Sequence, residues 1–200
     1  MNFISDVLFW ISNGLLVPVV VLLILLFIRA LVLLISFFGQ YVYSSRVSSA
    51  LDKEMKELSS ANVVDLDRRL PSKGKSLVVR YIRMMLESRD NQARMHMLLS
   101  EFEIEADKDL SVSKTLSKLG PMLGLMGTLI PMGPALVGLS TGDISSMAYN
   151  MQVAFATTVV GLFSSAVGFI TQQTKQRWYQ RDLANLELVN ELLDTEPDRK

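Results

Sequence analysis

Three long apolar stretches alternate with charged ones along the chain, and their lengths predict three helices that cross a membrane. The first covers residues 15–38, and the other two cover 116–139 and 147–171. No charged residue or histidine lies between 119 and 139 or between 147 and 170. A helix needs about 20 residues to cross a hydrocarbon core of ~30 Å. Because the linking residues 140–146 are too few for a domain, the last two stretches are predicted to form a helical hairpin in the membrane.

The rest of the chain is polar and is also predicted to be helical. A pattern without a breaker runs from about Arg89 to Pro121, so we expect one long helix that continues into the second span. A short segment could begin at Asn62 or Asp65 and end before Pro71. Apolar residues recur at helical spacing in three groups: Ala50, Leu51, Met55 and Leu58; Val78, Val79, Ile82, Met85 and Leu86; and, in residues 172–200, Leu183, Leu186, Val189 and Leu193. The third group is expected either to bundle with copies of itself or to pack on the 39–115 domain.

Composition favours a polytopic membrane protein over a single soluble core. Half of the 200 residues are apolar, and 20 basic residues balance 20 acidic ones. With no cysteine and a single histidine, His96, neither disulfides nor thiolate or histidine metal clusters are expected. We also expect no cofactor and no nucleic-acid partner.

The distribution of basic residues predicts the orientation of the spans. Residues 1–14 and 140–146 contain no Lys or Arg, whereas residues 40–118 contain 14 of the 20. By the positive-inside rule, the N-terminus lies outside and the central domain and tail lie in the cytoplasm of a plasma (inner) membrane protein. The predicted order is an extracytoplasmic N-terminus (1–14), a span (15–38), a helical cytoplasmic domain (39–115), a span (116–139), an extracytoplasmic link (140–146), a span (147–171) and a cytoplasmic tail (172–200).

Arg29 interrupts the first span and needs a physical reason. A charge at the bilayer centre costs at least about 2.5–3.5 kcal/mol on insertion scales. The favoured interpretation is that the helix begins near Val7, so that the Arg29 side chain reaches the cytoplasmic headgroups. The alternative is a pair with a buried acid on a partner.

Small and hydroxyl-bearing residues share one face on each hairpin helix. Such faces let helix backbones approach closely in a membrane, and this packing role is the simpler interpretation for the glycines, Gly127 included. For the threonines a second role is open, because rings of hydroxyls in an oligomer could line a narrow polar path. The faces consist of Gly120, Gly124 and Thr128 on the first helix, and of Ala154, Thr158, Gly161, Ser165 and Gly168 on the second.

Two ordered motifs on the hairpin resemble signatures of the MotA/TolQ/ExbB proton-channel family. The segment Pro121–Leu129, PMLGLMGTL, resembles that family's PLLGLLGTV signature. The segment Ala156–Leu162, ATTVVGL, is similar to its ATAIGL signature on the next helix. The resemblance covers about residues 117–170 by motif and the rest by layout. The chain departs from the family at one position, because Val153 stands where transport members often carry a Glu five residues before the second threonine.

This resemblance implies an all-α fold with three spans, assembled as a pentameric ring around two single-span partner helices of the ExbD/TolR/MotB kind. Carried over by position, Thr128 and Thr158 are pore-facing hydroxyls. Thr157 lies about 100° round the helix from Thr158 and is expected to contribute less to the pore. Three spans in 200 residues match the transport-type layout, whereas flagellar-type members have four spans and a larger cytoplasmic domain.

A proton path usually needs an Asp, Glu or His within the membrane, and neither hairpin helix has one between residues 119–139 and 147–170. Threonine hydroxyls can coordinate or relay ions but do not titrate near neutral pH. If the chain conducts, the titrating carboxylate must therefore come from another chain, in agreement with the membrane Asp that the resemblance implies for the partner. The expected function is an ion (proton) channel or stator subunit of a membrane motor, not an enzyme. A flagellar-type stator and a non-conducting membrane scaffold are the alternatives.

Overall fold

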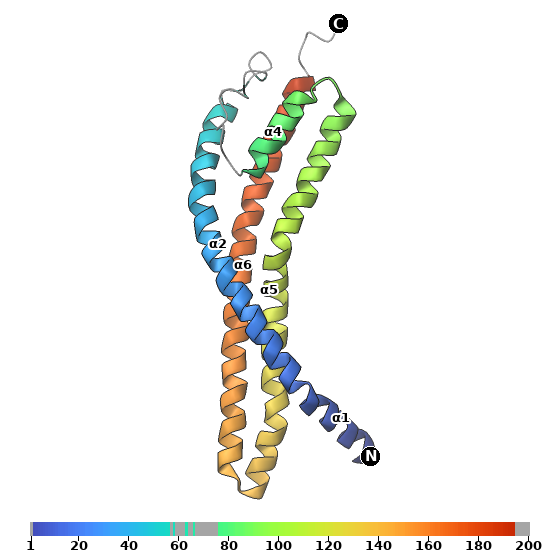
Figure 1. Cartoon of the computed structure of the whole chain (residues 1–200), viewed down its shortest axis with the longest axis vertical. Helices are drawn as coiled ribbons and strands as arrows, with labels where there is room; N and C mark the ends of the chain where they lie inside the picture. Colours follow the sequence, from blue (N-terminus) through green and yellow to red (C-terminus); the bar gives the residue numbers. More distant parts are fainter. Residues whose placement is uncertain (1, 57, 59–62, 64–65, 67–75, 195–200) are drawn as a thin grey trace. The chain divides into compact units, whose positions relative to one another are not determined.

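The computed structural model is all-helical and describes residues 2–56, 58, 63, 66 and 76–194. Three stretches are long and apolar enough to cross a membrane, namely Val7–Tyr41, Gln92–Thr141 and Ile144–Asp194. This confirms the prediction of an all-helical chain with three membrane-spanning segments. The short segment expected before Pro71 lies largely outside the described residues. The helices are α1 (Asn2–Gly14), α2 (Leu16–Lys56), α4 (Leu77–Glu87), α5 (Gln92–Thr141) and α6 (Ile144–Asp194) (Figure 1).

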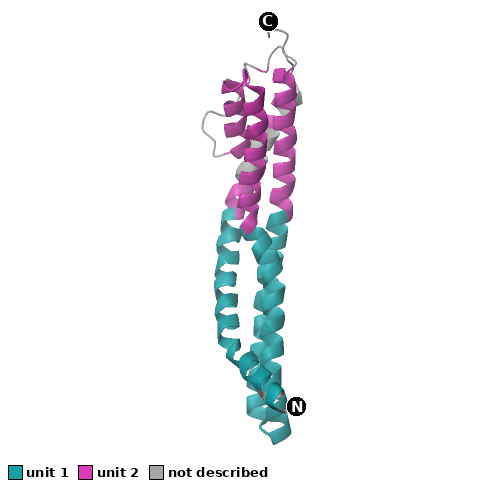
Figure 2. Cartoon of the chain, turned by 90° about the vertical axis from the view of Figure 1, so that its right-hand side faces the viewer, with its two compact units in different colours: residues 1–36, 112–172 teal, residues 37–111, 173–200 magenta. Residues whose placement is uncertain are grey.

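The chain forms two compact units, which Figure 2 colours separately. Unit 1 consists of Met1–Ser36 and Val112–Gln172, and unit 2 consists of Phe37–Ser111 and Gln173–Lys200. The long helix predicted from about Arg89 is present as α5, which contains residues of both units. The uncharged parts of the hairpin helices therefore belong to unit 1.

In unit 1, α2 packs against both hairpin helices, antiparallel to α5 and parallel to α6. Val19 and Leu23 share a buried cluster with Ile130 of α5, and Ala30 shares another with Leu116 and Val167. Later residues of α2 thus meet earlier residues of α5, which fixes the antiparallel register. Between the clusters, the rings of Phe27 and Phe163 lie 5.6 Å apart.

A tight turn joins α5 to α6. Gly142 has a φ of 76°, a backbone conformation that glycine adopts without the Cβ clash of other residues. The N–H of Asp143 donates to the carbonyl oxygen of Gly138 at 2.8 Å. The Asp143 carboxylate then accepts a hydrogen bond of 3.0 Å from the N–H of Ser146 and so caps the first turn of α6.

Prolines occur within two of the long helices. Pro18 lies in the first turn of α2, where a missing N–H is tolerated. Pro121, Pro131 and Pro134 lie inside α5, which continues as a helix through all three. A proline inside a helix frees the carbonyl oxygen four residues earlier, and within a membrane that oxygen needs another donor.

Unit 2 has its own apolar core. All three predicted apolar groups contribute to it, through residues such as Leu51 of α2, Ile82 of α4 and Leu186 of α6. The apolar stripe of the tail therefore packs on residues of the 39–115 block, which was one of the two alternatives for it. His96 lies exposed on α5 outside this core.

Two polar clusters, both outside the apolar hairpin stretches, tie the helices of unit 2 together. The side chain of Lys175 is 6% exposed and its Nζ donates to Asp109 Oδ2 at 2.8 Å, while the Tyr179 hydroxyl donates to the same oxygen at 2.7 Å. Burial, together with the nearby Asp109, raises the pKa of Tyr179, so this hydroxyl keeps its proton. The second cluster joins Arg80 and Tyr81 of α4 to Glu105 of α5.

Candidate functional site

The hairpin helices α5 and α6 approach each other most closely at glycines. A Cβ built on Gly120 would lie 2.6 Å from the carbonyl oxygen of Gly161, and one built on Gly161 would lie 2.6 Å from that of Gly120. A Cβ on Gly168 would lie 2.7 Å from the Cβ of Leu116, whereas one on Gly124 would lie 3.5 Å from the nearest atom, the Cα of Gly161. A larger residue at the first three positions would therefore force the helices apart, and Gly124 is the looser contact.

Ser165 supplies a hydrogen bond across this contact. Its Oγ donates to the carbonyl oxygen of Ser117 on α5 at 3.0 Å. Ser117 lies four residues before Pro121, whose ring nitrogen has no hydrogen to donate. The serine hydroxyl thus satisfies a carbonyl oxygen that the proline leaves without its usual helical partner.

Thr157 lies within the contact between α5 and α6 of the same chain. It is 7% exposed, and its Oγ1 donates to the carbonyl oxygens of Val153 and Ala154 at 3.1 and 2.9 Å. A Cβ on Gly127 would lie 2.6 Å from both Cβ and Oγ1 of Thr157. Within a single chain, Thr157 therefore packs against Gly127 and does not face outward.

Thr128 and Thr158 are half-buried and lie on the margin of the same contact. Thr128 Oγ1 donates to the carbonyl oxygen of Leu125 at 2.7 Å, and Thr158 Oγ1 donates to that of Ala154 at 3.0 Å. Each hydroxyl proton is therefore used within its own helix, while the oxygen lone pairs can still accept a hydrogen bond or coordinate a cation.

The register of the hairpin places these two threonines at nearly the same depth. Gly127 of α5 meets Thr157 of α6, and each of the two residues is followed directly by one of the outward-lying threonines, Thr128 and Thr158. Because the helices are antiparallel, Thr128 lies about 1.5 Å nearer the hairpin turn than Gly127, and Thr158 lies about 1.5 Å farther from the turn than Thr157. The depths of Thr128 and Thr158 therefore differ by about 3 Å. The structure thus gives the hairpin two half-exposed hydroxyl oxygens at one level.

The chemistry available to this site is ion coordination or relay. Between 119 and 139 and between 147 and 170, all of them described residues, the chain has no Asp, Glu, His, Lys or Arg. The nearest acid along the chain in unit 1 is Asp143, which caps α6 at the turn. The hairpin can therefore accept hydrogen bonds from water or coordinate an ion, but it cannot itself take up and release a proton.

Two contacts of the site do not follow from residue spacing alone. The small-residue faces predict close packing of the hairpin helices, but they do not single out the bond from Ser165 to the Ser117 carbonyl oxygen. The available signal is Pro121, because a proline inside a span identifies the carbonyl oxygen four residues earlier as one that needs a donor. The pairing of Thr157 with Gly127 carries no signal of this kind.

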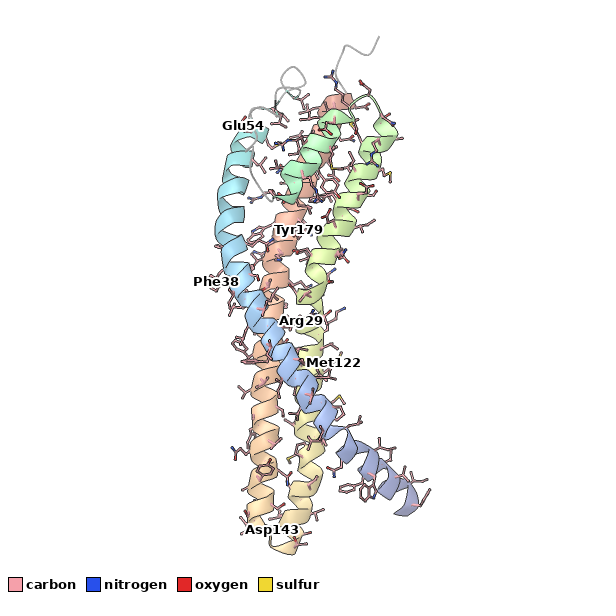
Figure 3. All side chains as sticks on the ribbon, viewed as in Figure 1. Arg29, Phe38, Glu54, Met122, Asp143 and Tyr179 are labelled. Carbon is pink, nitrogen blue, oxygen red and sulfur yellow. The ribbon has the colours of Figure 1, made fainter. Side chains whose placement is uncertain are left out.

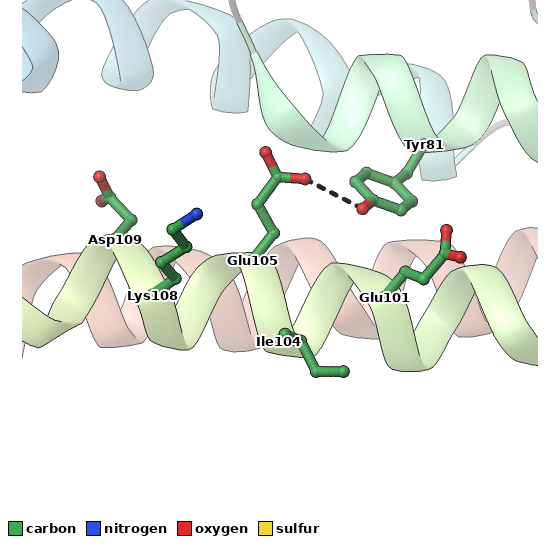
Figure 4. A pocket seen from close by; sticks show the side chains of 6 residues that line it. All are labelled: Tyr81, Glu101, Ile104, Glu105, Lys108 and Asp109. Atoms are coloured by element: carbon green, nitrogen blue, oxygen red, sulfur yellow. Dashed lines mark hydrogen bonds between the residues drawn. The ribbon is translucent and has the colours of Figure 1, made fainter.

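A surface pocket in unit 2 lies between Tyr81 of α4 and residues of α5 (Figure 4). Figure 4 shows the Tyr81 hydroxyl pointing to Glu105, to which it donates at 3.0 Å. Arg80 lowers the pKa of Glu105, chiefly through a side-chain hydrogen bond, so this carboxylate stays ionised and ties α4 to α5. The pocket is therefore explained by helix packing. Its lining residues are Tyr81, Glu101, Ile104, Glu105, Lys108 and Asp109.

Comparison with known proteins assigns the hairpin to a family. The model of the MotA/TolQ/ExbB proton channel family matches residues 72–188, more than half of the chain. The matched range includes the threonines and glycines described above. Searches among curated proteins and among solved structures found no match.

Proposed function

Since this chain belongs to the MotA/TolQ/ExbB proton channel family, we propose that it is the ring-forming, ion-conducting subunit of a membrane motor. It is a multi-pass membrane protein, because three of its helical stretches can span a membrane and its family is one of channel-type energiser subunits. In the proposed role it couples a proton gradient to mechanical work in biopolymer transport or another envelope process.

One observation carries the proposal. Thr128 and Thr158 place half-exposed hydroxyl oxygens at nearly one depth of a hairpin that has no Asp, Glu, His, Lys or Arg between 119–139 and 147–170. A site of this kind can pass an ion to a group that titrates, but it needs that group from another chain. A single-span ExbD/TolR/MotB-like partner with a membrane Asp would supply it, and protonation and release of that Asp would drive relative rotation.

The proposed assembly is a homo-pentamer around two partner helices. Large side chains of unit 1 such as Leu129, Phe155 and Val159 are 63%, 64% and 66% exposed and would be covered by lipid or by neighbouring copies. Native mass spectrometry of the detergent-purified protein should show a discrete ring. A stable monomer under conditions that preserve activity would contradict this part of the proposal.

The proposed placement is a plasma (inner) membrane, with the N-terminus and residues 140–146 outside and unit 2 in the cytoplasm. The lack of Lys and Arg in the link and their abundance in 40–118 support it. Because the chain has no native cysteine, single cysteines report the topology directly. Ser145→Cys should be labelled by an impermeant maleimide from outside, and Ser88→Cys only from the cytoplasm; the reverse pattern would contradict this orientation.

Ion flux into proteoliposomes that contain both subunits tests the function itself. Thr→Val keeps the side-chain shape and removes the hydroxyl. Thr128→Val and Thr158→Val should leave the ring intact and abolish partner-dependent flux, whereas Thr157→Val, inside the helix contact, should matter less. If both valine variants conduct normally, these threonines are packing residues. If the wild-type ring conducts nothing with its partner, the chain is a scaffold.

A further inference from the structure

Two basic residues of unit 1, Arg29 on α2 and Lys118 on α5, lie at nearly the same depth. Ala30, which follows Arg29, is fully buried and belongs to one cluster with Leu116 and Val167. Arg29 is one residue from Ala30 and Lys118 is two residues from Leu116, in both cases toward the hairpin turn. At about 1.5 Å per residue, the two Cα atoms differ in depth by only about 2 Å.

Both side chains are exposed beside exposed apolar neighbours. One helical turn nearer the hairpin turn lie Leu25 on α2 and Met122 on α5, which are 56% and 60% exposed. Figure 3 labels Arg29 and Met122 on these two helices, which pack together in unit 1. The apolar surface of α2 continues past the arginine to Val32, 58% exposed, so this guanidinium would lie among apolar groups without an anion beside it.

Among the described residues of unit 1, no acid lies on a helix at this depth. Its sequence contains two acids, Asp6 and Asp143. Asp143 caps α6 at the hairpin turn, and α1, which carries Asp6, lies on the half of the hairpin near the turn, because a Cβ on Gly133 would meet the Phe9 ring at 3.7 Å. A second copy of unit 1 aligned in the same membrane would bring its α1 and its Asp143 to that other end as well.

We propose that Arg29 and Lys118 bind the phosphate groups of anionic phospholipids in the leaflet away from residues 140–146. A guanidinium presents paired donors that match a phosphate, and a lysine adds a point charge. Their apolar stems and the exposed Leu25 and Met122 would lie along the acyl chains. The proposal rests on the membrane placement proposed above, in which this is the cytoplasmic leaflet, but it needs neither a partner subunit nor conduction.

Native mass spectrometry of the full chain released from nanodiscs of mixed phosphatidylglycerol and phosphatidylcholine measures which lipid stays bound. The wild type should retain phosphatidylglycerol in preference to phosphatidylcholine. Arg29→Gln and Lys118→Gln should each reduce that preference by about fivefold, as expected for about 1 kcal/mol per basic residue near the surface. The double variant should abolish it, and Arg29→Lys should fall between wild type and Arg29→Gln.

Arg94→Gln is the matched control, because it removes a charge from the same helix 24 residues before Lys118, about 36 Å away. It should leave the preference unchanged, and a loss equal to that of Lys118→Gln would overturn the proposal. An unchanged preference in the double variant, or a wild type without preference, would do the same. Displacement of the lipid by excess inorganic phosphate would assign the site to free phosphate instead.

The alternative to lipid on the surface around Arg29 and Leu25 is a second copy of the chain. In a protein without native cysteines, Leu25→Cys would be protected from a lipid-soluble maleimide in the assembled ring if a neighbour covered it, and that result would overturn the lipid assignment. Rapid labelling of this cysteine by the same reagent in the assembled ring supports the lipid assignment. A ring that binds the lipid but conducts no ions would overturn the proposed function alone.

Discussion

Ser165 on α6 donates a hydrogen bond to the carbonyl oxygen of Ser117 on α5, 48 residues earlier in the chain. The bond exists because Pro121 cannot donate to that oxygen. It joins the two hairpin helices next to Gly120 and Gly161, where the backbones are too close for a side chain. One proline thus leaves a carbonyl oxygen of the span without its helical donor, and one serine on the facing helix supplies a hydrogen bond to it.

Ser165→Ala should destabilise the hairpin by about 1–2 kcal/mol, the range measured for interhelical hydrogen bonds in model peptides, because the Ser117 carbonyl oxygen loses its donor within an apolar span. Unfolding of the purified protein in mixed micelles with increasing sodium dodecyl sulfate measures this change. Ser164→Ala is the matched control, since Ser164 donates to the carbonyl oxygen of Val160 in its own helix at 2.8 Å and should matter less.

The proline itself provides the sharper test. In a Pro121→Ala background the backbone N–H at position 121 returns and can donate to the Ser117 carbonyl oxygen, so Ser165→Ala should cost little there. The double-mutant cycle isolates this coupling from general effects of either substitution. Equal costs of Ser165→Ala in both backgrounds would show that the serine acts by packing alone.

Gly161→Ala and Gly124→Ala form a second matched pair. The new Cβ at Gly161 would lie 2.6 Å from the carbonyl oxygen of Gly120, a backbone atom that yields only if the helices separate. Such overpacking costs about 1–3 kcal/mol and should also weaken assembly. At Gly124 the nearest atom is 3.5 Å away, an ordinary contact, so alanine should be tolerated there. The same detergent titration checks both, and equal stability of the two variants would contradict the register described here.

The three spans and the hairpin could be predicted because long uncharged runs of sequence are rare outside membrane helices. The apolar stripes of unit 2 could be predicted for a similar reason, since residues such as Ile82 and Leu186 recur at helical spacing whether or not their partners are known. The stripe did not indicate its partner, however. Packing of Leu186 on the same core as Leu51 depends on contacts between residues far apart in sequence.

Polar contacts between distant residues were the least predictable. The spacing of the acidic residues from Glu101 to Asp109 indicates only a polar helix face, yet Glu105 pairs with Arg80 and Asp109 pairs with Lys175. Both pairs join residues at least 25 positions apart, so no spacing rule along one helix identifies them. A charge pattern predicts which face is polar, whereas the fold decides which charges meet.

The Asp109 cluster yields the last prediction. Asp109→Asn keeps the side-chain shape but leaves the ammonium of Lys175, whose side chain is 6% exposed, without its counter-charge. Because Asp109 itself is 43% exposed, we expect a loss of about 1–3 kcal/mol, below the range for a fully buried pair. Lys175→Met should cost less, since it fills the same space with apolar atoms and leaves the carboxylate in water. In a Lys175→Met background, Asp109→Asn should cost little more.

Trp178 gives this prediction a local readout. Its ring stacks on Phe37 at 5.9 Å and it precedes Tyr179, which shares the Asp109 oxygen with Lys175. The chain has two tryptophans, so thermal unfolding followed by fluorescence in a Trp10→Phe background reports on unit 2 alone. The expected order of melting temperatures is wild type, then Lys175→Met, then Asp109→Asn. If Lys175→Met melts lower than Asp109→Asn, the lysine stabilises unit 2 through its packing and hydrogen bonds and not through the need to neutralise a buried charge.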